Sequence, residues 1–215
     1  MITPETVGAA LDAARGRIAS AGRDPAEVRI VAVTKGQPAE AVAAALGAGV
    51  ADIGENYAQE LLAKAAEVSG PRWHFLGAVQ RNKVRSLAPV VHLWQSVDRR
   101  EEAAAITRAA PAAAMLVEVR LAGGPERGGC PPGEVEDLVT GLRLAGNRVD
   151  GLMAVGVPGP PDNSREGFRW LAGEARRLGL EEVSMGMTDD LEVAVAEGAT
   201  MVRLGRALFG PRPGG

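Results

Sequence analysis

The feature that most constrains the fold is an alternation of short apolar runs with longer helix-like stretches, which begins at Arg29 and continues almost to the end of the chain. This rhythm is typical of parallel strands joined by crossover helices. The candidate strands are Arg29 to Thr34, Asp52 to Ile53, Trp73 to Leu76, Val90 to Trp94, Ala114 to Val119, Gly151 to Val155, Glu182 to Ser184 and Met201 to Leu204. Eight strands within 215 residues predict an α/β fold, a single (β/α)8 TIM-type barrel domain over 1–215.

Helix signals accompany the strands. Residues 2–21 predict an extra N-terminal amphipathic helix that covers part of the barrel, because Val7, Leu11, Ala14 and Ile18 are spaced for burial on one face. Pro38 stands where a first turn would begin, directly after the first strand. Asp189 is placed to cap a helix after the seventh strand, with Glu192 three residues later. The tail 211–215 is expected to be frayed.

Composition narrows the function classes. Apolar residues make up 46% of the chain, enough for a sizeable core without disulfides or metals, and the single Cys130 excludes an internal disulfide. The net charge is −3 with no block of like charge, so neither nucleic acid nor an anionic membrane is indicated as a partner. Because no secretion signal and no membrane-length apolar run is visible, we expect a cytoplasmic protein with a small-molecule partner.

Polar residues at strand C-terminal ends are the candidates for chemistry, because those ends share one mouth in a parallel barrel. Lys35 directly follows the first strand, and burial there would lower the pKa of its amine. A deprotonated amine is what a carbonyl compound needs for Schiff-base formation. On position alone, the more common alternative is a lysine whose amine reaches solvent from the strand end.

The segment 198–210 predicts a phosphate site, because a strand that ends in glycine before a short helix forms such sites after strands seven and eight of a barrel. Gly205 would let a phosphate approach the backbone, and Arg206 would offer charge. The turn containing Met187 and Thr188 would add amide donors. Each piece alone is more often an ordinary turn.

Other polar residues leave alternatives open. Arg203 would be a salt-bridge partner if it points outward and a ligand contact if it points inward. His74 and Ser184 lie in or after strands, and a lone histidine among apolar residues is more often a hydrogen-bonded core residue than a catalyst. Asn56 and Tyr57 follow the second strand and could cap and pack the next helix, with Asn56 the better candidate for a ligand neighbour.

Signatures of several enzyme classes are absent from the sequence. It has no paired histidines for zinc, no Gly-x-Ser-x-Gly elbow, no P-loop and no strand-linked Gly-x-Gly-x-x-Gly fingerprint. The sequence therefore favours neither a standard hydrolase nor a nucleotide-binding protein, and no metal site is predicted.

A set of ordered motifs resembles one known family. The motifs are Val31-Ala-Val-Thr-Lys35, Gly54-Glu-Asn-Tyr57, Trp73-His-Phe-Leu-Gly77 with Gln80-Arg-Asn-Lys83, Gly151-Leu-Met153, Ser184-Met-Gly-Met-Thr-Asp189, and Val202-Arg-Leu-Gly205 with Phe209-Gly210. In order and spacing along nearly the whole chain they resemble the pyridoxal phosphate homeostasis protein family.

The resemblance implies a barrel similar to the N-terminal domain of alanine racemase, with pyridoxal 5′-phosphate (PLP) on Lys35 as a Schiff base. By the same comparison Asn56 would flank the cofactor ring, Arg203 would face its nitrogen, and the phosphate would lie among Met187, Thr188, Gly205 and Arg206. Together with His74 and Ser184, these are the candidate cofactor-binding residues, and no catalytic residue is assigned.

Three positions depart from the family pattern. Thr188 replaces an expected serine and keeps a hydroxyl, while Arg206 stands where a small hydroxyl residue is common. Arg127 occupies a loop position where lysine is expected, so a cofactor-transfer role for that lysine is in doubt here, because a guanidinium does not form Schiff bases.

The resemblance implies a non-catalytic carrier or regulator in intracellular vitamin B6 and amino-acid homeostasis. PLP would be its ligand, PLP-dependent apo-enzymes are candidate partners, and a monomer is expected. The alternative is a PLP-dependent amino-acid racemase of the alanine racemase type. Racemisation needs a second base, which in alanine racemase is a tyrosine from another domain and subunit, and this chain ends where that domain would begin. A phosphosugar-binding barrel would use Gly205 without needing Lys35.

Overall fold

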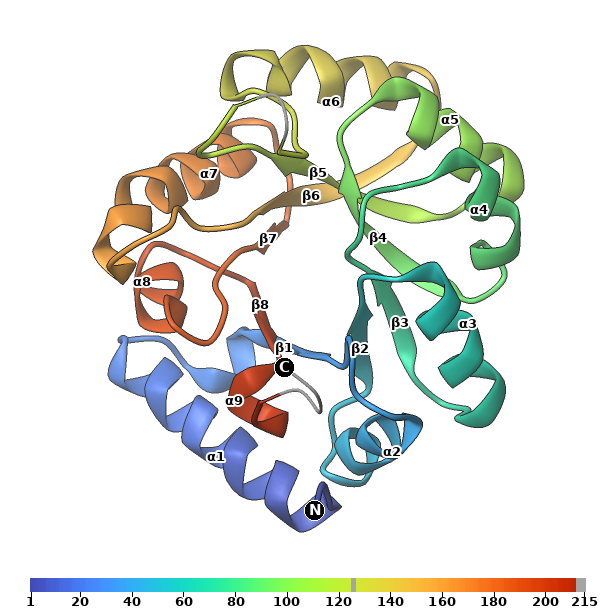
Figure 1. The fold of residues 1–215 in the computed structure, drawn as a ribbon. Coiled ribbons are helices and arrows are strands. Elements are labelled where there is room, and N and C mark those ends of the chain that lie inside the picture. The colour runs from blue at the N-terminus through green and yellow to red at the C-terminus, as the bar shows by residue number, and fades with distance from the viewer. Residues whose placement is uncertain (125–126, 212–215) are drawn as a thin grey trace.

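The strands form one closed parallel barrel in the computed structural model, which describes residues 1–124 and 127–211. The strands are β1 (Arg29–Val33), β2 (Asp52–Glu55), β3 (Arg72–Phe75), β4 (Val91–Val97), β5 (Ala114–Val119), β6 (Arg148–Ala154), β7 (Glu182–Ser184) and β8 (Met201–Leu204). They pair in chain order, and β8 pairs with β1 to close the sheet (Figure 1). The predicted fold class is confirmed.

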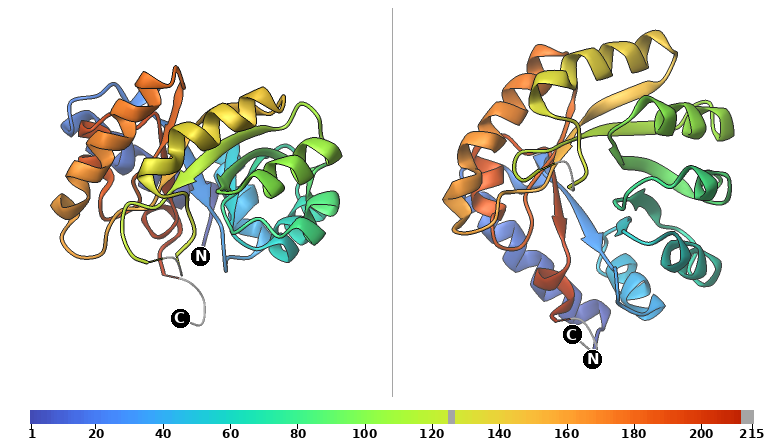
Figure 2. Two further views of the ribbon diagram at one scale, coloured as in Figure 1. Left: turned by 90° about the horizontal axis from the view of Figure 1, so that it is seen from above. Right: turned by 45° about the horizontal axis from the view of Figure 1, so that its top comes forward.

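Helices surround the barrel on the outside, as two further views show (Figure 2). They are α2 (Ala39–Gly47), α3 (Ala58–Glu67), α4 (Arg81–Leu87), α5 (Arg100–Ala109), α6 (Val135–Leu144), α7 (Arg165–Arg177), α8 (Leu191–Ala196) and α9 (Arg206–Phe209). Single turns of 3₁₀ helix lie at η1 (Pro25–Glu27), η2 (Pro132–Glu134) and η3 (Pro161–Ser164). Within the described ranges, no helix is both long and apolar enough to cross a lipid bilayer.

The N-terminal helix α1 (Pro4–Ser20) buries the four residues predicted for its apolar face, Val7, Leu11, Ala14 and Ile18. It packs against α2, α8 and α9 (Figure 1). The helix after β8, α9, has only four residues and is too short to cover the outer wall of the barrel. Helix α1 therefore completes the ring of helices at the seam between β8 and β1.

Strand β4 is longer than predicted because polar residues near its end are buried. Strand β4 continues past Trp94 to Val97, and the side chains of Gln95 and Ser96 are buried there. Two successive polar residues had indicated the end of an apolar run. In the structure both form hydrogen bonds inside the protein, so the strand continues.

Two helices begin within two residues of their predicted starts, but the roles predicted for Pro38 and Asp189 are wrong. Pro38 is the residue before α2 and lies outside its first turn. Asp189 does not cap α8, which begins at Leu191, because the Asp189 carboxylate forms an ion pair with Arg206. The neighbouring carboxylate of Asp190 accepts a hydrogen bond from the Met187 N–H at 2.6 Å and thereby closes the turn before the helix. Of the tail predicted to be frayed, 212–215 lie outside the described residues.

Candidate functional site

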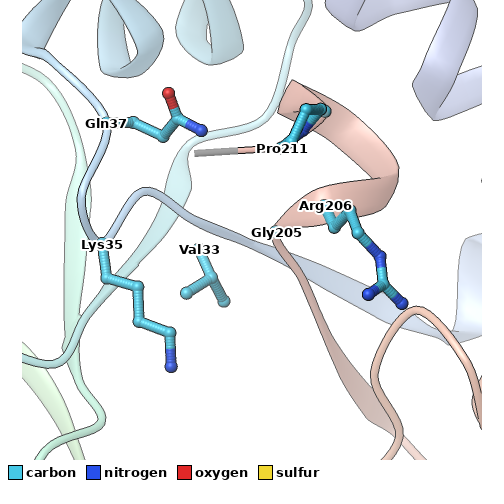
Figure 3. A pocket seen from close by; sticks show the side chains of 7 residues that line it. Val33, Lys35, Gln37, Gly205, Arg206 and Pro211 are labelled. Carbon is cyan, nitrogen blue, oxygen red and sulfur yellow. The ribbon is translucent and has the colours of Figure 1, made fainter. Parts of the chain in front are cut away.

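Seven of the predicted site residues line one cleft at the C-terminal ends of the strands. Two adjoining hollows of about 340 and 270 Å³ share Val33, Lys35, Gly205 and Arg206 and form this cleft. The predicted residues on its walls are Lys35, Asn56, Met187, Thr188, Arg203, Gly205 and Arg206. They come from the ends of β1, β2, β7 and β8, and in Figure 3 Lys35 and Arg206 lie on either side of Val33.

Lys35 occupies the second position of a tight turn that ends β1. The Gln37 N–H donates to the Thr34 carbonyl oxygen at 2.9 Å, and Gly36, in the third position, has a φ of 68°. That backbone conformation favours glycine and explains the residue that follows the lysine. The Lys35 side chain is half-buried and extends into the cleft (Figure 3).

Arg203 points into the barrel, which decides between the two orientations left open by the sequence. It is 5% exposed; Nη1 donates to the Ser184 carbonyl at 2.9 Å and to the Ser184 hydroxyl at 2.7 Å. Nη2 donates to the Ala154 carbonyl at 2.8 Å. Burial lowers the pKa of Arg203 to about 10, so the guanidinium remains protonated at neutral pH. A fixed cation therefore faces the cleft from its floor.

His74 and Ser184 do not line the cleft but are linked to it by hydrogen bonds through the barrel interior. The Ser184 hydroxyl donates to Gln95 Oε1 at 2.6 Å, and Gln95 Nε2 lies 2.7 Å from His74 Nδ1. His74 Nε2 lies 3.0 Å from Asp52 Oδ1. Burial lowers the pKa of His74 although its bond with Asp52 opposes this, so the ring is neutral at neutral pH. His74 is thus a hydrogen-bonded core residue, as its apolar neighbours indicated.

The predicted phosphate end of the cleft combines a hydroxyl, a cation and a residue without a side chain. Thr188 Oγ1 accepts a hydrogen bond from the Ala207 N–H at 3.2 Å. Arg206 and Asp189 are both exposed and form an ion pair with each other. Gly205 packs closely on β1, since a Cβ there would lie 3.2 Å from the Val33 carbonyl oxygen. An anion at this end would share Arg206 with Asp189.

Asn56 and Tyr57 separate into different roles. Asn56 lines the cleft, and its Oδ1 is buried without a hydrogen-bond partner among the described residues. Tyr57 is 60% exposed and stands at the N-terminus of α3, and it is not on the cleft walls. The structure therefore places Asn56, and not Tyr57, at the candidate site.

Glu118 is a cleft residue that the sequence reasoning missed. It lies one residue before the end of β5, and its side chain lines the cleft together with Lys35 and Arg203. Burial, reinforced by the nearby Asp98 carboxylate, raises the pKa of Glu118 to about 7. A charged residue near the C-terminal end of an otherwise apolar strand was the available signal.

These groups give the cleft a defined chemistry. It presents the Lys35 amine, the buried Arg203 guanidinium and the Glu118 carboxyl, whose pKa is raised to about 7. The Arg206 guanidinium lies at the opposite end. Within the described ranges, no cluster of histidine, cysteine and carboxylate side chains could hold a metal ion. The arrangement suits a small anionic molecule whose carbonyl group can react with an amine.

Comparison with known proteins finds a family model and relatives that each match most of this chain. The family described as alanine racemase, N-terminal domain, matches residues 10–213. The pyridoxal phosphate homeostasis protein of Pseudomonas aeruginosa is 41% identical over 208 residues, which cover 90% of this chain and 88% of that protein. The protein of the same name from Escherichia coli is 34% identical over 207 residues, covering 89% of this chain and 88% of that one.

Two solved structures have folds similar to that of this chain. PipY of Synechococcus elongatus with PLP bound is 32% identical, with a TM-score of 0.77 over 92% of this chain and 100% of that one. Alanine racemase of Clostridium difficile is 15% identical, with a TM-score of 0.75 over 94% of this chain and 57% of that one. The second likeness concerns the fold alone.

Proposed function

The chain belongs to the pyridoxal phosphate homeostasis protein family, and from that premise we propose that it binds pyridoxal 5′-phosphate through Lys35 and acts in vitamin B6 and amino-acid homeostasis without catalysing a reaction of its own. The observation that carries this proposal is the shared cleft of Lys35 and Arg203. One group can bond the aldehyde of the cofactor, and the other can meet its ring nitrogen.

The residues of the cleft fit this cofactor. The Lys35 amine would condense with the aldehyde to a Schiff base with loss of water. Asn56 would flank the ring, and its buried Oδ1 has no hydrogen-bond partner among the described residues. At the other end Thr188, Gly205 and Arg206 would surround the phosphate, with Met187 beside them. His74 and Ser184 would act behind Arg203 through their hydrogen bonds.

Arg203 supports a carrier more than a catalyst. PLP catalyses amino-acid reactions when its ring can accept electrons, and a protonated ring nitrogen favours this. The guanidinium of Arg203 has only donors and remains charged, so it would keep a neighbouring ring nitrogen unprotonated. The same residue that orients the cofactor would thus weaken its capacity for turnover.

Borohydride reduction tests the central proposal. The purified protein is incubated with PLP, reduced with borohydride and digested, and the masses of the peptides are measured by mass spectrometry. We expect a pyridoxyl adduct on the peptide that contains Lys35 and none in Lys35→Ala, with Lys83→Ala as a lysine control outside the cleft. An adduct confined to other lysines, or no adduct, would contradict the proposal.

A second assay tests the absence of catalysis. The holoprotein is incubated with single-enantiomer amino acids, and optical rotation is followed over time. We expect no change above that of free PLP. Turnover that disappears in Lys35→Ala would establish the racemase alternative in place of a carrier.

The proposal also concerns partners and assembly. A carrier needs recipients, and we propose PLP-dependent apo-enzymes in that role, with the protein itself a monomer. Pull-down of purified apo-enzymes by the holoprotein tests the first part, and sedimentation velocity tests the second. Retention of all the cofactor in the presence of the apo-enzymes would contradict a transfer role.

A further inference from the structure

A second lysine lies buried beside the Lys35 turn. Lys64 of α3 is 5% exposed, and its ammonium donates to three oxygen atoms. These are the Thr34 carbonyl at 2.8 Å, Glu55 Oε1 at 2.5 Å and Glu60 Oε2 at 3.0 Å. An ammonium has three protons, so all of them are used, as burial of this cation requires. We call Lys64, Glu55 and Glu60 the Lys64 cluster.

The contacts of the Lys64 cluster reach the peptide groups on both sides of Lys35. Before the lysine, the Thr34 carbonyl accepts from Lys64. After the lysine, the Gly36 N–H donates to Glu60 Oε2 at 2.8 Å. A third attachment comes from the Thr34 hydroxyl, which donates to Glu55 Oε1 at 2.7 Å. The turn that carries Lys35 is therefore held at each end by charged groups of β2 and α3.

None of the three cluster residues lines the cleft that residues 1–124 and 127–211 form. The cluster would therefore act on a ligand only through Lys35. A lysine side chain has four rotatable bonds, so the place of its amine depends first on a fixed backbone. Reactive groups need placement to within about 0.5 Å, which neighbouring groups must enforce.

We propose that Lys64 is a positioning residue for Lys35: with Glu55 and Glu60 it fixes the turn 34–37 so that the Lys35 amine faces the cleft and bonds the cofactor rapidly. The inference rests on the proposed function, because it concerns the same lysine. A buried ion cluster is a costly way to support a fold that an apolar contact could support as well. Its contacts are concentrated on the one turn where geometry matters.

Two substitutions at Glu60 test the proposal, because this residue is half-buried and its loss leaves the core intact. Glu60→Ala removes the acceptor of the Gly36 N–H, whereas Glu60→Gln keeps an oxygen there. Glu67→Ala, at the exposed end of α3, is the matched control. Stopped-flow absorbance after mixing with PLP gives the rate of bond formation at Lys35, and hydrogen exchange of the apoprotein gives the protection of the Gly36 amide.

We expect Glu60→Ala to slow bond formation about tenfold, which corresponds to the loss of one charge-assisted hydrogen bond. Its Gly36 amide should exchange faster than in the control. Glu60→Gln should restore the rate to within about threefold of wild type, because a neutral hydrogen bond is about half as strong. Wild-type rate and wild-type protection in Glu60→Ala would overturn the proposal.

A substitution of Lys64 is tested together with a substitution of its ion-pair partner, Glu55. Lys64→Met alone leaves the buried Glu55 carboxyl without its cation, so the double variant Lys64→Met/Glu55→Gln is the better probe. It should fold, as judged by circular dichroism, and react with PLP more slowly than Glu60→Ala. If wild type itself gives no adduct at Lys35, the proposed function fails; if wild type gives the adduct and all cluster variants match its rate, only the positioning role of Lys64 fails.

Discussion

The raised pKa of Glu118 predicts a pH-dependent stabilisation when its carboxyl is replaced by an amide. Burial and the Asp98 carboxylate raise this pKa from the ordinary value of 4.5 to about 7. The folded protein therefore binds the proton more tightly than the unfolded chain does. As the pH rises from about 4.5 to about 7, the unfolded chain loses its proton first, and the free energy of unfolding falls. Glu118→Gln removes this loss.

The size of the effect follows from the shift. A rise from 4.5 to about 7 corresponds to at most about 3 kcal/mol at about 1.4 kcal/mol per pKa unit. Glu118 lines an open cleft, and solvent there reduces the penalty, so we expect about 1–2 kcal/mol. The variant should match wild type at about pH 4.5, where the folded carboxyl is protonated, and exceed it above about pH 8.

Urea unfolding of the apoproteins between these pH values measures the difference directly. Glu166→Gln, an exposed position on α7, is the control for the general effect of removing one negative charge. A stability difference between Glu118→Gln and wild type that stays constant across the pH range would refute the reasoning, because the burial of a charge would then not be its cause.

Three further substitutions have definite outcomes. Ser184→Ala removes an acceptor from the buried Arg203 guanidinium and should lower the free energy of unfolding by about 1–3 kcal/mol in urea titrations. Gly77→Ala would place a Cβ against the Asn56 carbonyl oxygen, so it should cost about 1–3 kcal/mol and weaken PLP binding in a fluorescence titration. Arg206→Ala should leave the stability within about 0.5 kcal/mol. It should nevertheless lower the affinity for PLP more than that for pyridoxal, which lacks the phosphate, and equal losses would contradict a phosphate contact.

The architecture was largely predictable because apolar periodicity reports burial. Strands β5, β7 and β8 have the predicted bounds, and nearly all of their residues are buried. Strand β4 was predicted too short because Gln95 and Ser96 are polar and yet buried. Hydrogen bonds to partners far along the chain make that burial possible, and a local pattern carries no information about them.

The candidate site was predictable only in part for a related reason. Residues at strand ends, such as Lys35 and Arg203, follow from the geometry of a parallel barrel. Lys64 lies in the middle of a helix, where a lysine usually faces solvent, and its burial depends on Glu55 and the Thr34 carbonyl. No spacing rule connects those three positions, because the contact forms only when α3 packs on the barrel.

The hydrogen bonds inside the barrel have a direction that Asp52 fixes. Burial favours the protonated form of this carboxyl, but hydrogen bonds from His74 and Arg72 outweigh burial and hold the pKa of Asp52 below its ordinary value. As an ionised acceptor, Asp52 requires a proton on His74 Nε2 and leaves Nδ1 to accept from the Gln95 amide. The Gln95 oxygen must then accept the Ser184 proton, which leaves the Ser184 lone pairs for Arg203. A carboxylate at the start of β2 thus determines that the cation on the cleft floor meets only acceptors, and so keeps it aimed at the cleft.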